Sequence, residues 1–239
     1  LLIVKLKIIY RIHDLSLSHN LSSLYEVRSR ISNKVLNNSD LEKPTIDCVI
    51  PLKEKEFDSK IFNDVLNELV KSKVFGKIII WASFDIDLSD SYKNVTVLDR
   101  KYKVELEEKM IGPSISQDLK SLYNNLPKPD YVFFRNLNTP NIKYHYFIQM
   151  RFLVSLFKHV DCVLGTTTTK EIFYKFNGSS LEPVIDDEFI KNERHILYRK
   201  IRGFNLIKYE KLISKKTLVS GVISALPISN EDSMDRFIV

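Results

Sequence analysis

Short apolar segments alternate with amphipathic segments between residues 46 and 165, and this alternation constrains the fold more than any other feature of the sequence. Five strands are predicted, at 46–50, 77–82, 94–98, 130–134 and 160–165. Short apolar runs of this kind are typical of strands buried on both faces of a parallel sheet. Helices are predicted between them, at about 61–70, 115–122 and 141–158, from apolar residues spaced by three and four. Strands that alternate with helices predict an α/β fold with a mostly parallel central sheet.

The first 43 residues differ from the rest of the chain. Residues 14–40 are rich in Ser and Asn, and the spacing of apolar residues within them predicts a helix over about 22–37. Pro44 then marks a boundary. We therefore interpret 1–43 as an N-terminal appendage or the end of a preceding region, and 44–239 as one domain. The chain begins with Leu rather than Met, which suggests a fragment of a longer protein.

Composition and charge exclude several classes of protein. The 239 residues are 44% hydrophobic and 28% charged, which excludes a disordered or collagen-like chain. The 36 Lys and Arg exceed the 30 Asp and Glu, but basic and acidic residues are interleaved, so nucleic-acid binding is not expected. The excess fits solvated lysines or a phosphate-bearing ligand. The apolar N-terminal stretch is far shorter than the ~20 residues that span a bilayer, so no membrane partner is expected.

The cysteines and histidines indicate neither a metal centre nor a hydrolytic site. Cys48 and Cys162 each lie inside an apolar segment, and the chain has no Cys-x-x-Cys motif. This pattern favours buried, reduced thiols in a cytoplasmic protein over a zinc site or a disulfide. The five histidines are scattered, without a His-Glu-x-x-His motif or a nucleophile beside them.

Acidic residues follow the predicted strand at 77–82, at the end where ligands bind in parallel α/β sheets. Ser83 and the pair Asp85 and Asp87 stand there. Two carboxylates two residues apart could bind a divalent cation, as in a glycosyltransferase Asp-x-Asp motif. The alternative, which the residues favour, is a polar turn, because Asp87, Ser89 and Asp90 suit Asx turns. Both interpretations stay open.

An arginine and two amides follow the predicted strand at 130–134. Arg135, Asn136 and Asn138 could hold an anionic or hydroxyl-bearing ligand, because a guanidinium fork and amides suit such groups. Alternatively, Thr139 and the proline after it only begin the next helix.

Two further patterns lie nearer the C-terminus. The threonine run at 166–169 favours an edge strand that continues outward through 170–176. Glu231, Asp232 and Asp235 could supply a Mg²⁺ ligand at the sheet edge, or form a frayed acidic terminus.

Five segments, taken in order, carry a family resemblance. Residues 71–83 resemble a strand that ends in Ser or Thr, and 130–140 occupy the place of a strand and loop ending in an Arg-Pro or Ser-Pro signature. Residues 160–165, 202–208 and 233–235 resemble three later family segments, the last being the start of a metal motif. From about residue 46 to residue 235 the chain is therefore similar to the cytidylyltransferases that activate sugars such as sialic acids and Kdo, and to related spore-coat polysaccharide enzymes.

The resemblance implies a three-layer Rossmann-like nucleotide-diphospho-sugar transferase fold. It also implies a cytoplasmic enzyme that transfers CMP from CTP to a hydroxyl of a sugar acid and releases pyrophosphate. CTP and a sugar are the implied partners, Mg²⁺ is the implied cofactor, and a homodimer is left open. The site residues expected on this basis are Lys53 and Arg135 for catalysis, Pro51, Leu52, Lys55, Ser83, Asn136 and Asn138 for nucleotide or substrate, and Asp235 and Asp85 for the metal.

The sequence departs from the family in two places. The family's glycine-rich phosphate loop should follow Pro51, but 52–58 has no glycine, and its Glu54 and Glu56 would repel a triphosphate. The second Asp of the metal motif is replaced by Phe237. We therefore expect a divergent phosphate site or a loss of catalysis. The alternatives are a glycosyltransferase of GT-A type that uses the Asp-x-Asp pair, and an inactive binding module on the same fold.

Overall fold

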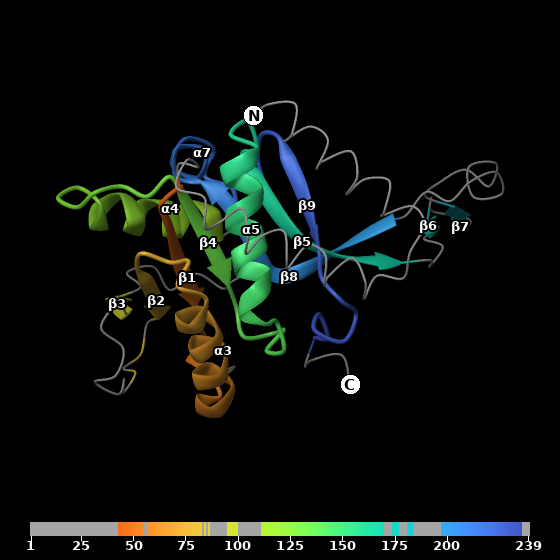
Figure 1. Ribbon diagram of the computed structural model, residues 1–239, viewed down its shortest axis with the longest axis horizontal. Helices are drawn as coiled ribbons and strands as arrows, with labels where there is room; N and C mark the ends of the chain where they lie inside the picture. Colours follow the sequence, from red (N-terminus) through yellow and green to blue (C-terminus); the bar gives the residue numbers. More distant parts are fainter. Residues whose placement is uncertain are drawn as a thin grey trace.

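The computed structural model describes residues 43–54, 57–82, 84, 86, 95–99, 111–169, 174–176, 181–183 and 197–235. They form a seven-stranded sheet with helices on both faces, and a separate two-stranded sheet (Figure 1). The large sheet contains β1 (Ile46–Pro51), β2 (Ile78–Ala82), β3 (Val95–Asp99), β4 (Tyr131–Arg135), β5 (Cys162–Thr169), β8 (Leu197–Lys208) and β9 (Ile223–Pro227). The small sheet pairs β6 (Tyr174–Phe176) with β7 (Leu181–Pro183). The helices are α3 (Ser59–Ser72), α4 (Ile111–Leu122), α5 (Tyr144–Leu156) and α7 (Tyr209–Lys215).

The strands of the large sheet follow the order β3-β2-β1-β4-β8-β5-β9. β1 pairs in parallel with β2 and β4, β2 with β3, and β5 with β9. β8 lies between β4 and β5 and is antiparallel to both. The predicted α/β fold with a mostly parallel sheet is therefore confirmed, and the five predicted strands correspond to β1 to β5.

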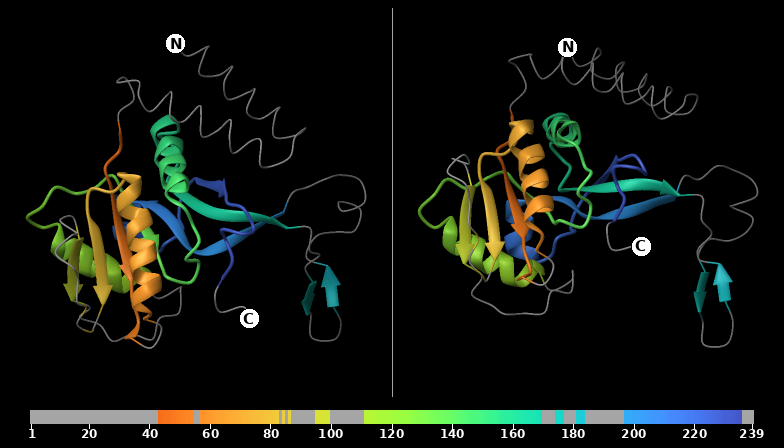
Figure 2. Two further views of the ribbon diagram at one scale, coloured as in Figure 1. Left: turned by 60° about the horizontal axis from the view of Figure 1, so that its bottom comes forward. Right: turned by 90° about the horizontal axis from the view of Figure 1, so that it is seen from below.

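Described helices cover both faces of the sheet (Figure 2). α3 and α5 pack on the face that carries Cys48, Phe133 and Leu206, whereas α4 and α7 pack on the opposite face with Val49 and Ile207. Successive residues of a strand point to opposite faces, so a strand that is apolar at every position fills both cores. The apolar runs of the sequence thus place the sheet at the centre of three layers.

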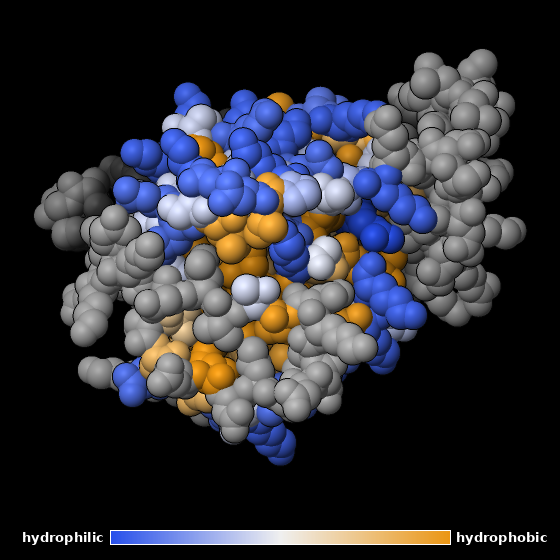
Figure 3. All heavy atoms as spheres, turned by 90° about the vertical axis from the view of Figure 1, so that its left-hand side faces the viewer, coloured by the Kyte–Doolittle hydropathy of each residue, from blue (hydrophilic) through white to orange (hydrophobic). Residues whose placement is uncertain are grey.

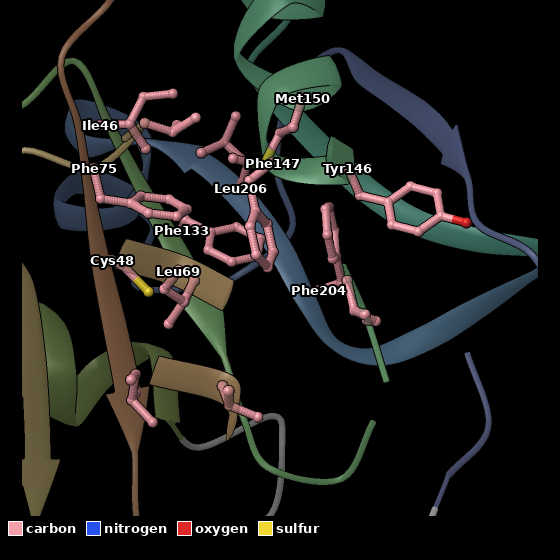
Figure 4. Close-up of a cluster of buried hydrophobic side chains, with 14 of the residues drawn as sticks. Ile46, Cys48, Leu69, Phe75, Phe133, Tyr146, Phe147, Met150, Phe204 and Leu206 are labelled. Carbon is pink, nitrogen blue, oxygen red and sulfur yellow. The ribbon is translucent and has the colours of Figure 1, made fainter. Parts of the chain in front are cut away.

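Phenylalanine side chains fill the core under α3 and α5 (Figure 4). The ring of Phe133 on β4 stacks on Phe75 with centroids 5.4 Å apart, and meets Phe147 and Phe204 edge-on at 5.6 and 4.8 Å. Edge-on and offset aromatic pairs stabilise a core beyond the area that they bury. Gly165 on β5 makes room for this cluster, because a Cβ there would lie 2.7 Å from Phe204.

The side of the molecule where β3 and α4 lie has a mixed surface. Hydrophilic side chains cover its upper part, and hydrophobic side chains are visible in the middle, next to residues that are not described (Figure 3). β3 is an edge strand of the sheet, so the sheet ends on this side.

The prediction of an edge strand at the threonine run is confirmed in part. Residues 166–169 pair with 200–197 of β8 on one side, whereas the pairing with β9 on the other side ends at Thr166, so among the described residues 167–169 pair with β8 alone. β5 and β8 continue beyond the rest of the sheet as a two-stranded ribbon (Figure 1). Part of the predicted continuation, 174–176, forms β6 of the separate small sheet.

The predicted helix at 22–37 and the appendage at 1–43 lie almost wholly outside the described residues, so they stay predictions. Among the helices that are described, none is both long and apolar enough to cross a membrane.

Candidate functional site at the carboxyl edge of the sheet

Polar loops gather where the parallel strands end. The loops after β1, β4 and β9 lie at this edge, together with Gly203 at the bend of the antiparallel β8 (Figure 1). Ligands of open parallel α/β sheets bind at the carboxyl ends of the strands. The carboxyl edge is therefore the candidate site, and three predicted residues, Arg135, Asn136 and Asn138, share one of its loops.

The guanidinium of Arg135 is turned into the protein and organises the loop that follows β4. The residue has 0% exposure. One terminal nitrogen donates to the carbonyl oxygen of Asn136 at 2.7 Å and to Thr139 Oγ1 at 2.9 Å, and the other donates to the Thr139 carbonyl. Burial lowers the pKa of Arg135 to about 10, which leaves it charged at neutral pH. Among the described residues no carboxylate pairs with it.

The loop after β4 rests against β8. Gly203 has φ of +72°, and a Cβ at this position would lie 1.5 Å from Asn136 Oδ1, so only glycine fits here. Thr139 Oγ1 donates to the carbonyl of Arg202 at 3.4 Å. Arg135 and β8 thus hold the loop from two sides.

Several buried oxygen atoms near this edge have no hydrogen-bond partner. They are Asn136 Oδ1 in the loop after β4, Thr166 Oγ1 and Thr167 Oγ1 on β5, and Asn205 Oδ1 on β8. Unpaired buried polar groups are costly, and they often mark places where a ligand or water completes the bonding. Asn138, in the same loop as Asn136, is partly exposed.

The described residues of the loop after β1 form hydrogen bonds within the protein. Asp58 Oδ1 accepts from the backbone N–H groups of Lys60 and Ile61, both at 3.0 Å, and so caps the first turn of α3. The N–H of Leu52 donates to the Trp81 carbonyl at 3.0 Å. Free backbone N–H groups at a helix N-terminus are what usually bind phosphate. Here a carboxylate of the chain occupies that position.

The other predicted residues of this region differ in how far they are exposed to solvent. Pro51 is partly exposed and ends β1, Leu52 is 2% exposed and belongs to the core, and Lys53 is partly exposed. Lys55, Ser83 and Asp85 lie outside the described residues, so their assignments stay predictions.

A hydrogen-bonded group that sequence reasoning missed fixes the segment after β9. The hydroxyls of Tyr146 on α5 and of Ser229 both donate to Asp232 Oδ2 at 2.8 Å, and the N–H of Ser229 donates to the Tyr146 hydroxyl at 3.2 Å. Burial lowers the pKa of the neighbouring His145, and the charge of Asp232 opposes this. In the sequence, the acidic cluster was the signal that could have pointed to this group. Tyr146 gave no signal, because a tyrosine in an apolar helix usually indicates core packing.

A complete metal site is not formed within the described ranges, since no three His, Cys, Asp or Glu side chains there could hold an ion together. Mg²⁺ in nucleotide sites commonly takes only one or two protein carboxylates and completes its shell with phosphate oxygens and water. Asp235, which is partly exposed, is one of the two carboxylates predicted for this role.

Comparisons with known proteins give a fold and no sequence family. No family model matches the chain, and no curated protein sequence matches it. The 4-diphosphocytidyl-2C-methyl-D-erythritol synthase from Anaerococcus prevotii has a TM-score of 0.57 at 11% identity, over 83% of this chain and 93% of the other. The 2-C-methyl-D-erythritol 4-phosphate cytidylyltransferase from Francisella tularensis has a TM-score of 0.54 at 12% identity, over 80% of this chain and 94% of the other. A CMP:2-keto-3-deoxy-manno-octonic acid synthetase complexed with CTP has a TM-score of 0.50 at 8% identity, over 77% of this chain and 90% of the other.

These likenesses show that the chain has the fold of the cytidylyltransferases, as the sequence resemblance implied. Sequence identities this low show the fold alone.

Proposed function

We propose that this chain is a cytidylyltransferase-like protein that takes CTP and a sugar acid at the carboxyl edge of its sheet. The observation that carries the proposal is the fold, which it shares over most of both chains with enzymes named for making cytidylyl products. In the proposed reaction a hydroxyl oxygen of the sugar acid bonds to the α-phosphorus of CTP. The bond to the β-phosphate bridging oxygen breaks, pyrophosphate leaves, and the hydroxyl proton passes to water. The CMP-sugar would serve surface-polysaccharide synthesis.

The residues divide into binding and positioning roles. Lys53 or Lys55 would face the triphosphate, and Pro51 and Ser83 would line the nucleotide. Leu52, whose side chain lies in the core, could contribute only its backbone. Asn136 and Asn138 would bind the nucleotide or the sugar. Arg135, which has no exposed surface, would act by positioning the loop that carries both amides.

Mg²⁺, homodimer formation and a cytoplasmic location belong to the same proposal. Asp235 would hold Mg²⁺ together with phosphate oxygens, and the ion would neutralise charge on the phosphates. Asp85 would be the metal ligand in the glycosyltransferase alternative. Both Cys48 and Cys162 are buried and free, which suits a reducing compartment.

A second candidate, a binding module without catalysis, is favoured by the Asp58 carboxylate that caps α3 after β1. Nucleotidyl transfer depends on positioning and on neutralising the phosphate charge. The Asp58 carboxylate opposes both, because it accepts the hydrogen bonds of the Lys60 and Ile61 N–H groups and adds a negative charge at the start of α3. A protein with this loop could bind a sugar or a nucleotide without transferring it.

Binding and turnover together separate the candidates. We would measure calorimetric binding of CTP with Mg²⁺, with a UDP-sugar as the matched control, and then pyrophosphate release with a panel of sugar acids. CTP binding with pyrophosphate release supports the transferase, and CTP binding alone supports the module. Binding of the UDP-sugar and not of CTP would overturn the proposal in favour of a GT-A-like glycosyltransferase. Binding of neither would overturn both enzyme candidates and leave the module.

A further inference from the structure

A cavity of about 660 Å³ lies at the opposite edge of the sheet, where the parallel strands begin. Its walls are the segments that lead into β1 and β4, the last turn of α5, and the junction of β8 with α7. Small-molecule sites in proteins commonly have volumes of about 300–1,000 Å³. None of the residues proposed above for the nucleotide site lines this cavity.

The walls of the cavity are held together by backbone hydrogen bonds. The N–H of Asp130 donates to the Thr45 carbonyl at 3.0 Å, and the N–H of Tyr209 donates to the Asp130 carbonyl at 3.0 Å. The Asp130 carboxylate accepts from the N–H and the hydroxyl of Thr45 at 2.7 and 2.8 Å. Segments from β1, β4 and β8 are thereby fixed to one another. A preformed site of this kind loses little freedom when a ligand binds.

The lining is rich in lysine and contains no arginine. The charged residues of the lining are Lys43, Lys128, Lys158 and Lys208, with Asp130 and Glu210. Lys208 pairs with Asp161, outside the lining, at 2.9 Å, whereas the hydrogen bonds from Thr45 leave the negative charge of Asp130 in place, so three other lysines stand against two carboxylates. Neither ion pair of the described residues includes Lys43 or Lys128. The cavity therefore has an excess of positive charge.

We propose that this cavity binds a small phosphorylated molecule. Lysine acts as a compact point charge suited to phosphate, whereas planar carboxylates are usually held by the fork of arginine, which is absent here. Pro44, Pro129, Tyr131 and Tyr209 supply apolar surface for the body of the ligand. The site is independent of the proposed CTP site, because it lies at the other edge of the sheet.

The test is a chemical-shift titration of the ¹⁵N-labelled protein with glycerol 2-phosphate at low salt. Saturable shifts are expected at the amides of Asp130, Tyr131 and Tyr209, which form the wall. The double variant Lys43→Gln with Lys128→Gln should weaken this affinity about tenfold, since two charges near a dianion are lost. Succinate, a dicarboxylate of similar charge, should bind more weakly.

The matched control is Lys60→Gln with Lys120→Gln, which removes two exposed lysines from α3 and α4, away from the cavity. It should leave the affinity unchanged. The proposal is overturned if the wall amides do not shift, if both double variants weaken binding equally, or if succinate binds as tightly. Shifts confined to 52–54 and 136–139 would place the phosphate at the carboxyl edge and would also overturn it.

Discussion

Arg135 illustrates how one buried charge can shape a loop. Its guanidinium satisfies two carbonyl oxygens and a hydroxyl of the segment that follows its own strand. A buried cation is costly unless such bonds compensate for the lost water. The loop and the arginine therefore depend on each other, and each is unstable without its partner.

Replacing Arg135 with Met should lower the free energy of unfolding by about 3 kcal/mol, because buried carbonyl acceptors lose their donors. Urea unfolding followed by circular dichroism measures this loss. Arg202→Met is the control, because Arg202 is an exposed arginine next to the same loop. Equal losses in the two variants would show that Arg135 does not organise the loop.

Gly203→Ala should cost about 3 kcal/mol in unfolding free energy, since the methyl group meets Asn136 and the positive φ disfavours alanine. Adding Asn136→Ala removes the clash but not the backbone strain. The double variant should therefore be more stable than Gly203→Ala alone. If it is not, the glycine is needed only for its backbone angle.

At the scale of elements, the cap of α3 decides how the loop after β1 meets a ligand. Asp58→Ala should cost about 1 kcal/mol of stability, whereas Asp58→Ser keeps a capping oxygen and should be nearly neutral. The serine variant also removes a negative charge near the proposed phosphate position, so CTP should bind about tenfold more tightly to it. Thermal unfolding and calorimetry measure the two effects. An unchanged CTP affinity would show that the triphosphate does not approach α3.

Asp161 joins the start of β5 to the end of β8 and to the turn before β9. Its carboxylate accepts from Lys208 Nζ at 2.9 Å and from the Val222 N–H at 3.1 Å, and Lys211 lies 3.7 Å away. The hydrogen bond from Lys208, followed by that from Val222, lowers the pKa of Asp161 below its usual value. Such a group stabilises the fold above its unfolded pKa, and this stability is lost as the pH falls through its folded pKa.

Asp161→Asn should therefore be less stable than the wild type by about 2 kcal/mol at neutral pH. The difference should shrink only below about pH 4, where the unfolded-state carboxyl takes up its proton. Urea unfolding across a pH series measures this difference. A difference that stays constant down to the acid limit would mean that the ion pairs contribute nothing.

At the scale of the whole molecule, the sequence was informative where burial imposes a pattern. Strands buried on both faces must be apolar throughout, so β1, β2, β4 and the start of β5 could be predicted from their residues alone, whereas β3 is an edge strand with an exposed Thr96. β8 was not predicted, because Arg199, Lys200 and Arg202 make its first half as charged as a surface loop. It is instead the antiparallel strand that joins the two parts of the sheet.

The candidate site was predicted less completely than the fold. The location followed from strand ends, but the inward turn of Arg135 did not, because an exposed and a buried arginine look alike in sequence. The contact of Tyr146 with Asp232 joins residues 86 positions apart, and no local pattern reports such a contact. The basic cavity also escaped prediction, since its lysines come from separate segments.

The most direct test of the central claim is to map CTP with Mg²⁺ on the ¹⁵N-labelled protein by chemical-shift titration. We predict saturable shifts at 52–54, 136–139, 202–203 and 229–235, all at the carboxyl edge of the sheet. The absence of shifts at saturating CTP, or shifts confined to the opposite edge, would contradict the proposal that this fold serves cytidylyl chemistry here.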